Sequence, residues 1–478
     1  MSAHQVVLEK MLLTPNRKLD CGASSTSELS LMLSAVNFVA PHTTIQKQLA
    51  DLWSDIFGVE VGIHHNFFEL GGDSIKATIF FNRLQEKFGG IFYIVALFEA
   101  PTIAEFEAYL HRHYPELVAR MSGQQACTTT AASSDREALL FSGDRISTTQ
   151  VAQLHQLILT LPPRQETPTT KNPKAIFILS AARSGSTLFR IILAGHPQLF
   201  APPQLCLLQF NTLAERKAVL DGKYGFWREG TIQAIKQIQG CNTEQAQHLM
   251  HQMEEQQLTT QEFYHWLQQQ LENKLLVDKT TTYAFNQETL QRAETDFDDP
   301  IYIHLVRHPY GAIRSFEEAK LDLTLHPFIP KLKDSNVPPF TRRELAELLW
   351  LISNQNIVDF LKDVPEERQY RLRFEDLVTH PETTLKNLCQ FIDLDFHPDM
   401  LQPYGDRKQR MTEGLHSASR MLGDLKFYEH KGITAEVADK WRNYYTIDFL
   451  GDVTWQVAES LGYTERVVTV SDREEGEI

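Results

Sequence analysis

This sequence has few cysteines, no long apolar run and no excess of positive charge. Its five cysteines, among 478 residues, are scattered without a CxxC pair or the spacing of metal ligands, so we predict a reducing compartment, no disulfide framework and no metal site. No run of about 18 apolar residues occurs, so we predict no membrane partner, and the opening MSAHQVVLEK lacks the apolar core of a signal peptide. The formal net charge of -15 argues against nucleic acid as a partner, because phosphate backbones are held by basic surfaces. These absences predict a soluble, cytoplasmic protein.

The chain is too long for one average core, and its hydrophobic content of 42% is that of an ordinary globular protein. Two stretches poor in apolar residues, CGASSTSELS and SGQQACTTTAASSD, divide it and are typical of linkers. We therefore expect a leading segment over residues 1–22, a linker over 23–40, a helical domain over 41–115, a linker with a connecting helix over 116–173, an α/β domain over 174–465 and a disordered acidic tail over 466–478.

The helical domain shows apolar residues at helical spacing, among them Leu49, Leu52 and Ile56. This spacing predicts a small all-α bundle of four helices. The turn LGGDS precedes the second helix, and its two glycines allow a sharp bend. Ser74 then opens that helix, where backbone N–H groups and the helix dipole favour an attached phosphodiester. The simpler alternative is that Asp73 or Ser74 only caps the helix.

From residue 174 onward, strand and helix patterns alternate. AIFIL, KLLVD and IYIHLVR read as buried strands, whereas TLFRIILA and RELAELLWLISNQNIVDFL read as helices. This alternation predicts a parallel sheet covered by helices on both faces. The predicted fold class is therefore multidomain, with a helical bundle and an α/β domain.

The stretch SAARSGSTLF follows the first of these strands and predicts an anion site at a strand–turn–helix junction. Gly185 permits close backbone approach, Arg183 supplies a planar cation, and three hydroxyl donors complete the turn, namely Ser184, Ser186 and Thr187. The triphosphate-loop pattern GxxxxGK[ST] is absent, because Ser180 and Ser186 stand at its first glycine and its lysine. A plain serine-rich turn is the alternative.

The stretch IHLVRHPYGAIRSF supplies a second candidate element. Arg307 ends a strand and Ser315 lies about two helical turns further on. Both could hold one further phosphate at the carboxyl edge of the sheet, where open α/β sheets bind ligands. A surface arginine and an exposed serine are the alternative.

The helical domain resembles the peptidyl or acyl carrier domains of nonribosomal peptide and polyketide synthases, through DLWSDIFGVEVGIHHNFFELGGDSIKA and LFEAPTIAEFEAYL. The resemblance implies a 4′-phosphopantetheine arm on Ser74, a phosphopantetheinyl transferase, upstream synthetase modules and a role in secondary metabolite biosynthesis. VVLEKMLLTPNRKLD looks like the last motif of an adenylation domain, whose lysine would be Lys18. We interpret this segment as a remnant or as a cut through a larger assembly line.

From about Lys174 to Tyr463 the chain resembles the sulfotransferase family, through the two anion elements together with LLVDKTTTYA, RLRFEDLVTHPETTLKNLCQFI and HKGITAEVADKWR. The resemblance implies 3′-phosphoadenosine 5′-phosphosulfate as donor, with its phosphosulfate in the RSGST turn and its 3′-phosphate on Arg307 and Ser315. Arg183 would stabilise the leaving group. Lys279 is a candidate second cation or acceptor-binding residue, with a solvated lysine as the alternative.

The sequence departs from the family pattern after the first helix. Sulfotransferase domains built into polyketide and peptide synthases carry P-P-E-L-H-L-L, whose Glu and His serve the acceptor, but this chain reads PPQLCLL with Gln204 and Cys206. Neither a carboxamide nor a neutral thiol is a good general base near neutral pH. Three interpretations stay open. The first is another base, such as His416 or His430, and the second is a degenerate domain that docks the carrier without sulfation. The third is acyl transfer through Cys206, against which stands the simpler interpretation of Cys206 as a small buried hydrophobe.

The expected function is sulfation of a hydroxyl on a carrier-tethered intermediate. The alternative is a degenerate sulfotransferase-fold domain that docks, acyl-transfers or releases that intermediate.

Overall fold

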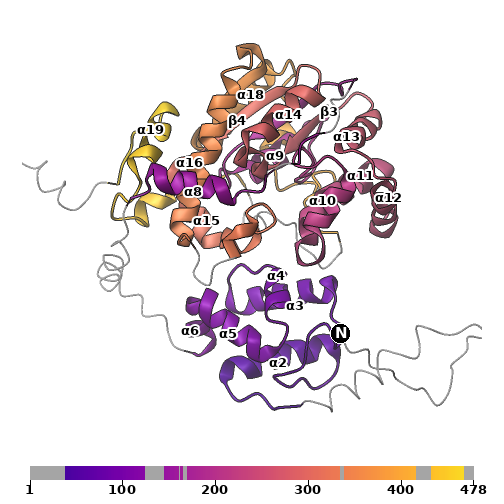
Figure 1. Cartoon of the computed structure of the whole chain (residues 1–478), viewed down its shortest axis with the longest axis vertical. Coiled ribbons are helices and arrows are strands. Elements are labelled where there is room, and N and C mark those ends of the chain that lie inside the picture. The colour runs from indigo at the N-terminus through magenta and orange to yellow at the C-terminus, as the bar shows by residue number, and fades with distance from the viewer. Residues whose placement is uncertain are drawn as a thin grey trace, which may run out of the picture. The chain divides into compact units, whose positions relative to one another are not determined.

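The structure, a computed structural model, divides into two compact units, residues 1–129 and 130–478 (Figure 1). It describes residues 38–123, 145–160, 162–164, 169–333, 339–415 and 432–467. The predicted adenylation remnant with Lys18, and the candidate bases His416 and His430, lie outside the described residues. Within the described part, no helix is both long and apolar enough to cross a membrane.

The first unit is the predicted helical bundle. Its helices are α2 (Thr44–Phe57), α3 (Ser74–Phe88), α4 (Val95–Glu99), α5 (Ile103–His113) and α6 (Pro115–Met121). Trp53 is fully buried and packs edge-on against Phe67 and Phe80, with ring centroids 5.0 and 6.0 Å apart. Rings that large bury much apolar area, so this cluster holds a small domain together.

Helix α6 extends this unit beyond the predicted boundary at residue 115. Leu117 and Met121 are buried, and the Tyr114 hydroxyl donates to the carbonyl oxygen of Ile91 at 2.9 Å. Pro115 restarts the chain as a helix directly after α5. A helix of seven residues is too short to reveal an apolar period in the sequence, so the sequence alone predicts a linker there.

The second unit contains a five-stranded, all-parallel sheet in the order β2-β3-β1-β4-β5. Its strands are β1 (Ala175–Leu179), β2 (Leu199–Phe200), β3 (Leu275–Lys279), β4 (Ile301–Val306) and β5 (Gln369–Arg373). The register pairs Ile178 of β1 with Lys279 of β3, and Leu179 with His304 of β4. The carboxyl ends of these three strands therefore lie at one edge, as the strand pattern predicted.

Helices cover both faces of the sheet. The α-helices described in this unit are α8 (Thr148–Leu157), α9 (Ser186–Leu193), α10 (Leu213–Leu220), α11 (Glu229–Gln239), α12 (Thr243–Glu255), α13 (Thr260–Gln269), α14 (Gln287–Asp296), α15 (Pro309–Ala319), α16 (Arg342–Leu361), α17 (Phe374–Thr379), α18 (Pro381–Phe391) and α19 (Asp452–Ser460). Figure 1 shows α9, α14, α16 and α18 gathered around β3 and β4.

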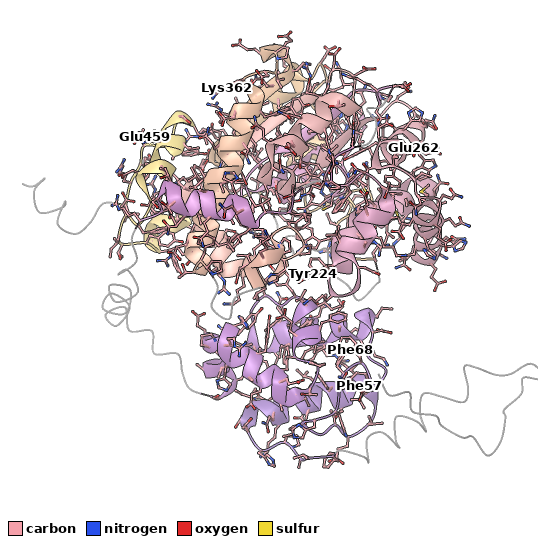
Figure 2. The ribbon with its side chains drawn as sticks, in the orientation of Figure 1. Phe57, Phe68, Tyr224, Glu262, Lys362 and Glu459 are labelled. Atoms are coloured by element: carbon pink, nitrogen blue, oxygen red, sulfur yellow. The ribbon has the colours of Figure 1, made fainter. Side chains whose placement is uncertain are left out.

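Alternate residues of β1 enter different apolar clusters. Phe177 packs with residues of α13, α14 and α16, whereas Ile176 and Ile178 pack with residues of α9 and α18. Successive strand side chains point to opposite faces, so this alternation produces the predicted double-covered sheet. Charged residues such as Glu262, Lys362 and Glu459 are exposed on the outside of the unit (Figure 2).

The predicted connecting helix is α8, and it packs into the second unit. Leu154 is fully buried and Ile146, just before the helix, is 4% exposed in the same apolar cluster. A Cβ on Gly451 would lie 2.1 Å from the carbonyl oxygen of Ile146, so the two backbones meet directly. The packed unit thus includes residues well before the predicted boundary at residue 174.

Candidate functional site

The turn between β1 and α9 is held in an unusual backbone conformation. Arg183 has φ 66° and Gly185 has φ 88°, both in the left-handed region that favours glycine. A Cβ on Gly185 would lie 2.2 Å from Cδ2 of Phe374. Gly185 is therefore required twice, for its dihedral angle and for the close approach of the Phe374 ring.

The start of α9 lacks a side-chain cap, as do the starts of α11, α15, α17, α18 and α19 in the same unit. Five of the other helices described in this unit carry a capping box, at Ser147 (α8), Thr212 (α10), Asn242 (α12), Thr259 (α13) and Thr341 (α16). Helix α9 is preceded by Gly185 and has no side-chain cap. The hydroxyls of Ser180 and Ser184 are buried without a hydrogen-bond partner among the described residues. An open helix start with spare hydroxyl donors fits a bound anion.

The structure brings the two predicted anion elements into direct contact. The Nε of Arg183 donates to the hydroxyl oxygen of Ser315 at 3.0 Å. The Nη1 of Arg307 donates to the carbonyl oxygen of Arg183 at 2.9 Å. The Arg307 guanidinium also lies over the Phe374 ring, 4.4 Å from its centroid. Ser186, the first residue of α9, is buried beside this turn, and Thr187 is half-buried.

Phe374 is the part of this arrangement that the sequence did not reveal. It begins α17, far along the chain from both predicted elements. One face of its ring supports Arg307 and its edge closes on Gly185. Its only signal in the sequence is its place in RLRFEDL, directly after a strand.

Lys279 and Gln204 form a second polar pair at the same sheet edge. Lys279 ends β3 and is 3% exposed, so the alternative of a solvated lysine is wrong. Its Nζ donates to Oε1 of Gln204 at 2.7 Å. Burial above all, and then the positive charge of Arg190, lower the pKa of Lys279 to about 7. A substantial fraction of this amine is therefore neutral near pH 7.

Cys206 is buried in full. Burial raises the pKa of its thiol to about 12, so the thiolate that acts as nucleophile is scarce at neutral pH. Its backbone N–H donates to the Thr280 hydroxyl at 3.2 Å, and Nε of Arg216 donates to its carbonyl oxygen at 3.1 Å. These features favour the interpretation of Cys206 as a small buried hydrophobe.

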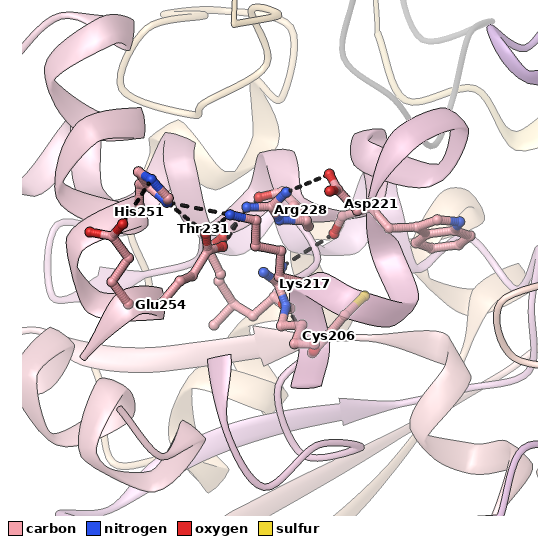
Figure 3. Close-up of polar contacts among 11 residues, drawn as sticks. Cys206, Lys217, Asp221, Arg228, Thr231, His251 and Glu254 are labelled. Carbon is pink, nitrogen blue, oxygen red and sulfur yellow. Dashed lines mark hydrogen bonds and ion pairs between the residues drawn. The ribbon is translucent and has the colours of Figure 1, made fainter. Parts of the chain in front are cut away.

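A polar network lies beside Cys206 (Figure 3). Arg228 contacts Asp221 at 3.2 Å and also pairs with Glu254. The Thr231 hydroxyl donates to the carbonyl oxygen of Arg228 at 2.7 Å, and Lys217 lies 3.3 Å from Glu254. This network ties the start of α11 to α10 and α12.

The start of α11 in turn supports the segment of Gln204. A Cβ on Gly230 would lie 1.9 Å from the carbonyl oxygen of Gln204. The glycine thus lets the helix backbone press directly on the backbone of this segment.

The buried carboxylate of Asp278 holds three hydroxyl groups in place beneath the segment of Gln204 and Cys206. Oδ2 of Asp278 accepts hydrogen bonds from the hydroxyls of Tyr264 at 2.5 Å and Tyr283 at 3.0 Å. Its Oδ1 accepts from the Thr280 hydroxyl at 3.0 Å. Tyr283 also accepts a hydrogen bond from the N–H of Leu207 at 2.8 Å. The segment of Gln204 and Cys206 is therefore positioned through Asp278.

The turn at the start of α3 holds the predicted attachment residue. Asp73 caps the helix, its Oδ1 accepting from the N–H of Lys76 at 2.8 Å, and Ser74 is the first helical residue. Gly71 has φ 84°, and a Cβ on Gly72 would lie 2.3 Å from the Phe67 ring. Of the two capping alternatives, Asp73 is the cap.

Two family profiles match the chain. One, described as the sulfotransferase family, covers residues 173–398. The other, described as a phosphopantetheine attachment site, covers residues 47–110.

Two solved structures resemble the second unit. A sulfotransferase domain from the curacin biosynthetic pathway is 39% identical, with a TM-score of 0.56, and the match covers 62% of this chain and 99% of that one. A sulfotransferase domain from the olefin synthase of Synechococcus PCC 7002 is 35% identical, with a TM-score of 0.54, covering 63% of this chain and 100% of that one. These matches agree with the observed parallel-sheet fold.

Curated relatives match a shorter stretch. A linear gramicidin synthase of Brevibacillus parabrevis is 43% identical over 106 residues, which is 22% of this chain and 2% of that protein. A surfactin synthase of Bacillus subtilis is 37% identical over 114 residues, 23% of this chain and 3% of that protein. The chain therefore spans only a small share of these synthetases.

Proposed function

Because this chain belongs to the sulfotransferase family and also contains a phosphopantetheine attachment domain, we propose that it sulfates a hydroxyl on a carrier-tethered intermediate. The donor is 3′-phosphoadenosine 5′-phosphosulfate, and the acceptor is held by a phosphopantetheine arm on Ser74 or on a neighbouring carrier. The observation that carries the proposal is the Arg183–Ser315 hydrogen bond together with the Arg307 contact to the Arg183 carbonyl.

The β1–α9 turn is proposed to receive the phosphosulfate end of the donor. It offers the uncapped N–H groups of α9 and the buried hydroxyls of Ser180 and Ser184, which suit anionic oxygens. Arg307 and Ser315, at the end of β4 and in α15, are proposed to hold the 3′-phosphate. The carboxyl edge of a parallel sheet is the usual ligand side of such folds.

The reaction forms a bond between the acceptor oxygen and sulfur and releases adenosine 3′,5′-bisphosphate. Arg183 is proposed to stabilise the negative charge that grows on the departing phosphate. Its contact with Ser315 holds the guanidinium in place before the reaction, so little reorganisation is needed.

Upstream synthetase modules and a phosphopantetheinyl transferase are the proposed partners. The carrier profile supports both, since an attachment serine must be loaded and its arm must be charged. The two similar sulfotransferase domains come from a biosynthetic pathway and a synthase, which supports an assembly-line setting.

Acyl transfer through Cys206 is not proposed. The thiol is fully buried and its pKa is raised to about 12, whereas an acyl acceptor must be exposed and ionised.

The test is the intact mass of the full chain, loaded with a β-hydroxyacyl phosphopantetheine and mixed with the donor. We expect the arm to gain one sulfuryl group, or to lose water if the sulfate leaves by elimination. Calorimetric titration with adenosine 3′,5′-bisphosphate is the companion measurement. Absence of binding would support the degenerate-domain alternative, and binding with an unchanged arm across several acyl chains would refute sulfation.

A further inference from the structure

The acceptor hydroxyl must lose a proton during transfer, and the segment after β2 supplies no group to take it. Gln204 is a carboxamide that cannot accept a proton near neutral pH. Cys206 keeps its own proton, since burial raises the pKa of its thiol to about 12. The base must therefore come from another residue of the site.

Lys279 is a titratable group in direct side-chain contact with this segment. Its Nζ is hydrogen-bonded to Gln204 at 2.7 Å, a neutral partner that does not hold the amine in its charged form. Across the described residues, Lys279 makes no ion pair within 4.0 Å. It sits at the end of β3 beside β1, whose following turn is the proposed phosphosulfate site.

The titratable groups that face Lys279 come from four elements. Arg183 of the turn and Arg190 of α9 disfavour the ammonium form and Asp278 of β3 favours it, whereas Cys206 is a neutral thiol. Asp278 is already shared among three hydroxyl donors, Tyr264, Tyr283 and Thr280. With burial as the largest cause, the balance lowers the pKa of Lys279 to about 7.

We propose that Lys279, hydrogen-bonded to Gln204 and buried beside the anion turn, is the general base of the transfer. This inference rests on the proposed function. The lone pair of the neutral Nζ takes the acceptor hydroxyl proton as that oxygen bonds to sulfur. The bond between sulfur and the bridging phosphate oxygen breaks, and its electron pair leaves with adenosine 3′,5′-bisphosphate. Lys279 ends as an ammonium ion beside the departing anion.

Glu229 is the competing candidate that we choose among the described residues. It is half-buried at the first position of α11, next to Gly230, which presses on the backbone of Gln204. Burial raises the pKa of its carboxyl to about 8. It therefore serves as the rival in the tests below.

The first test measures the titration of Lys279 without any donor or acceptor. The full chain is labelled with 13Cε-lysine, and the Lys279→Met variant identifies the signal by its disappearance. We expect a midpoint near pH 7, and Gln204→Glu should raise it by about 1–3 units, because a carboxylate partner favours the ammonium form. Lys274→Met, which removes an exposed lysine just before β3, should leave the Lys279 signal in place. A midpoint near the ordinary value of about 10.4 would overturn the proposal.

The second test measures kcat/KM for sulfation against pH, which reports groups of the free enzyme. A base with a lowered pKa acts only when deprotonated, so the rate should fall as the pH drops below about 7. Lys279→Arg keeps the positive charge but cannot take a proton. It should lose about 10²–10⁴-fold in rate and retain its affinity for adenosine 3′,5′-bisphosphate.

The outcomes separate this inference from the proposed function. If the wild type transfers sulfate and Lys279→Arg keeps its rate, the lysine is only a cation and this inference is wrong. If Glu229→Gln removes the acidic limb of the profile while Lys279→Arg preserves it, the base is Glu229. If the wild type sulfates no acceptor, both the function and the base role fall, whatever the titration shows.

Discussion

Two turns in this chain each lead into a helix at a proposed phosphate position, and they are built in opposite ways. The turn before α3 satisfies its own helix start, because Asp73 is extended, with φ −134°, and accepts from the N–H of Lys76. The turn before α9 leaves its helix start open, because Gly185 has φ 88° and supplies no cap.

The difference corresponds to two ways of holding a phosphate. A phosphate that is covalently bonded to Ser74 needs no cage of N–H groups, so the helix can be capped by its neighbour. A phosphosulfate that must enter and leave is held only by non-covalent contacts, so the uncapped N–H groups and the buried hydroxyls of Ser180 and Ser184 remain available. A capped turn suits a tether, and an uncapped turn suits a ligand that exchanges.

The largest expected effect concerns the tether. Ser74→Ala should abolish addition of the phosphopantetheine arm, because alanine has no hydroxyl to form the phosphodiester. Intact mass after incubation with coenzyme A and a phosphopantetheinyl transferase measures it. Ser54→Ala, in α2 of the same unit, should load normally, and an arm found on Ser74→Ala would refute the assignment.

Next comes the cation of the open turn. Arg183→Ala should lower the sulfation rate by about 10²–10³-fold, in the range seen when one preorganised donor to a developing charge is removed. It should also weaken binding of adenosine 3′,5′-bisphosphate, measured by calorimetry. Arg371→Ala, an exposed arginine of β5, is the matched control, and equal rates for the two variants would contradict the role of Arg183.

The backbone of the open turn gives the third effect. Gly185→Ala should lower the free energy of unfolding by about 2–4 kcal/mol, from left-handed strain and the clash with Phe374. Gly240→Ala, at φ 59° with nothing within 4 Å of its Cβ, carries strain alone and should cost about 1–2 kcal/mol. Urea unfolding compares the two.

A companion substitution separates the clash from the strain. Phe374→Leu should recover part of the loss in Gly185→Ala, because a smaller side chain then faces the new Cβ. Strictly additive losses in the two substitutions would show that the clash is not the cause.

The smallest expected effect concerns the cap of α3. Asp73→Ala should destabilise the helix start by about 1 kcal/mol, whereas Asp73→Asn should retain the cap. Hydrogen exchange of the amide of Lys76 is the measurement, and faster exchange is expected only in the alanine variant. Unchanged exchange in that variant would refute the capping role of Asp73.

The sequence was sufficient for features that follow from local patterns. The order of strands and helices and the glycine turn at position 185 follow from short stretches of chain. The joint binding of one phosphate by Arg307 and Ser315 stays a prediction. Helix α6 escaped prediction, because an amphipathic period needs more than seven residues to appear.

Contacts between distant segments could not be predicted. Phe374 meets Gly185 only because β5 and β1 lie two places apart in the same sheet. Neither the sequence around Phe374 nor the sequence around Gly185 indicates this contact. The sequence leaves open whether Lys279 is a site cation or a solvated lysine at a strand end, and only the fold shows that it is buried against Gln204. Its lowered pKa is a property of that tertiary environment.

The hydrogen bond from Arg307 to the carbonyl oxygen of Arg183 has a consequence for how substitutions at these two positions combine. Arg307 acts on the backbone at 183 as well as on the 3′-phosphate that it is proposed to hold, so the two positions are energetically coupled. A substitution at position 307 changes the effect that a substitution at 183 has on stability and rate, so the effects of the two substitutions do not add. A double-mutant cycle over positions 183 and 307 should therefore return an interaction energy different from zero.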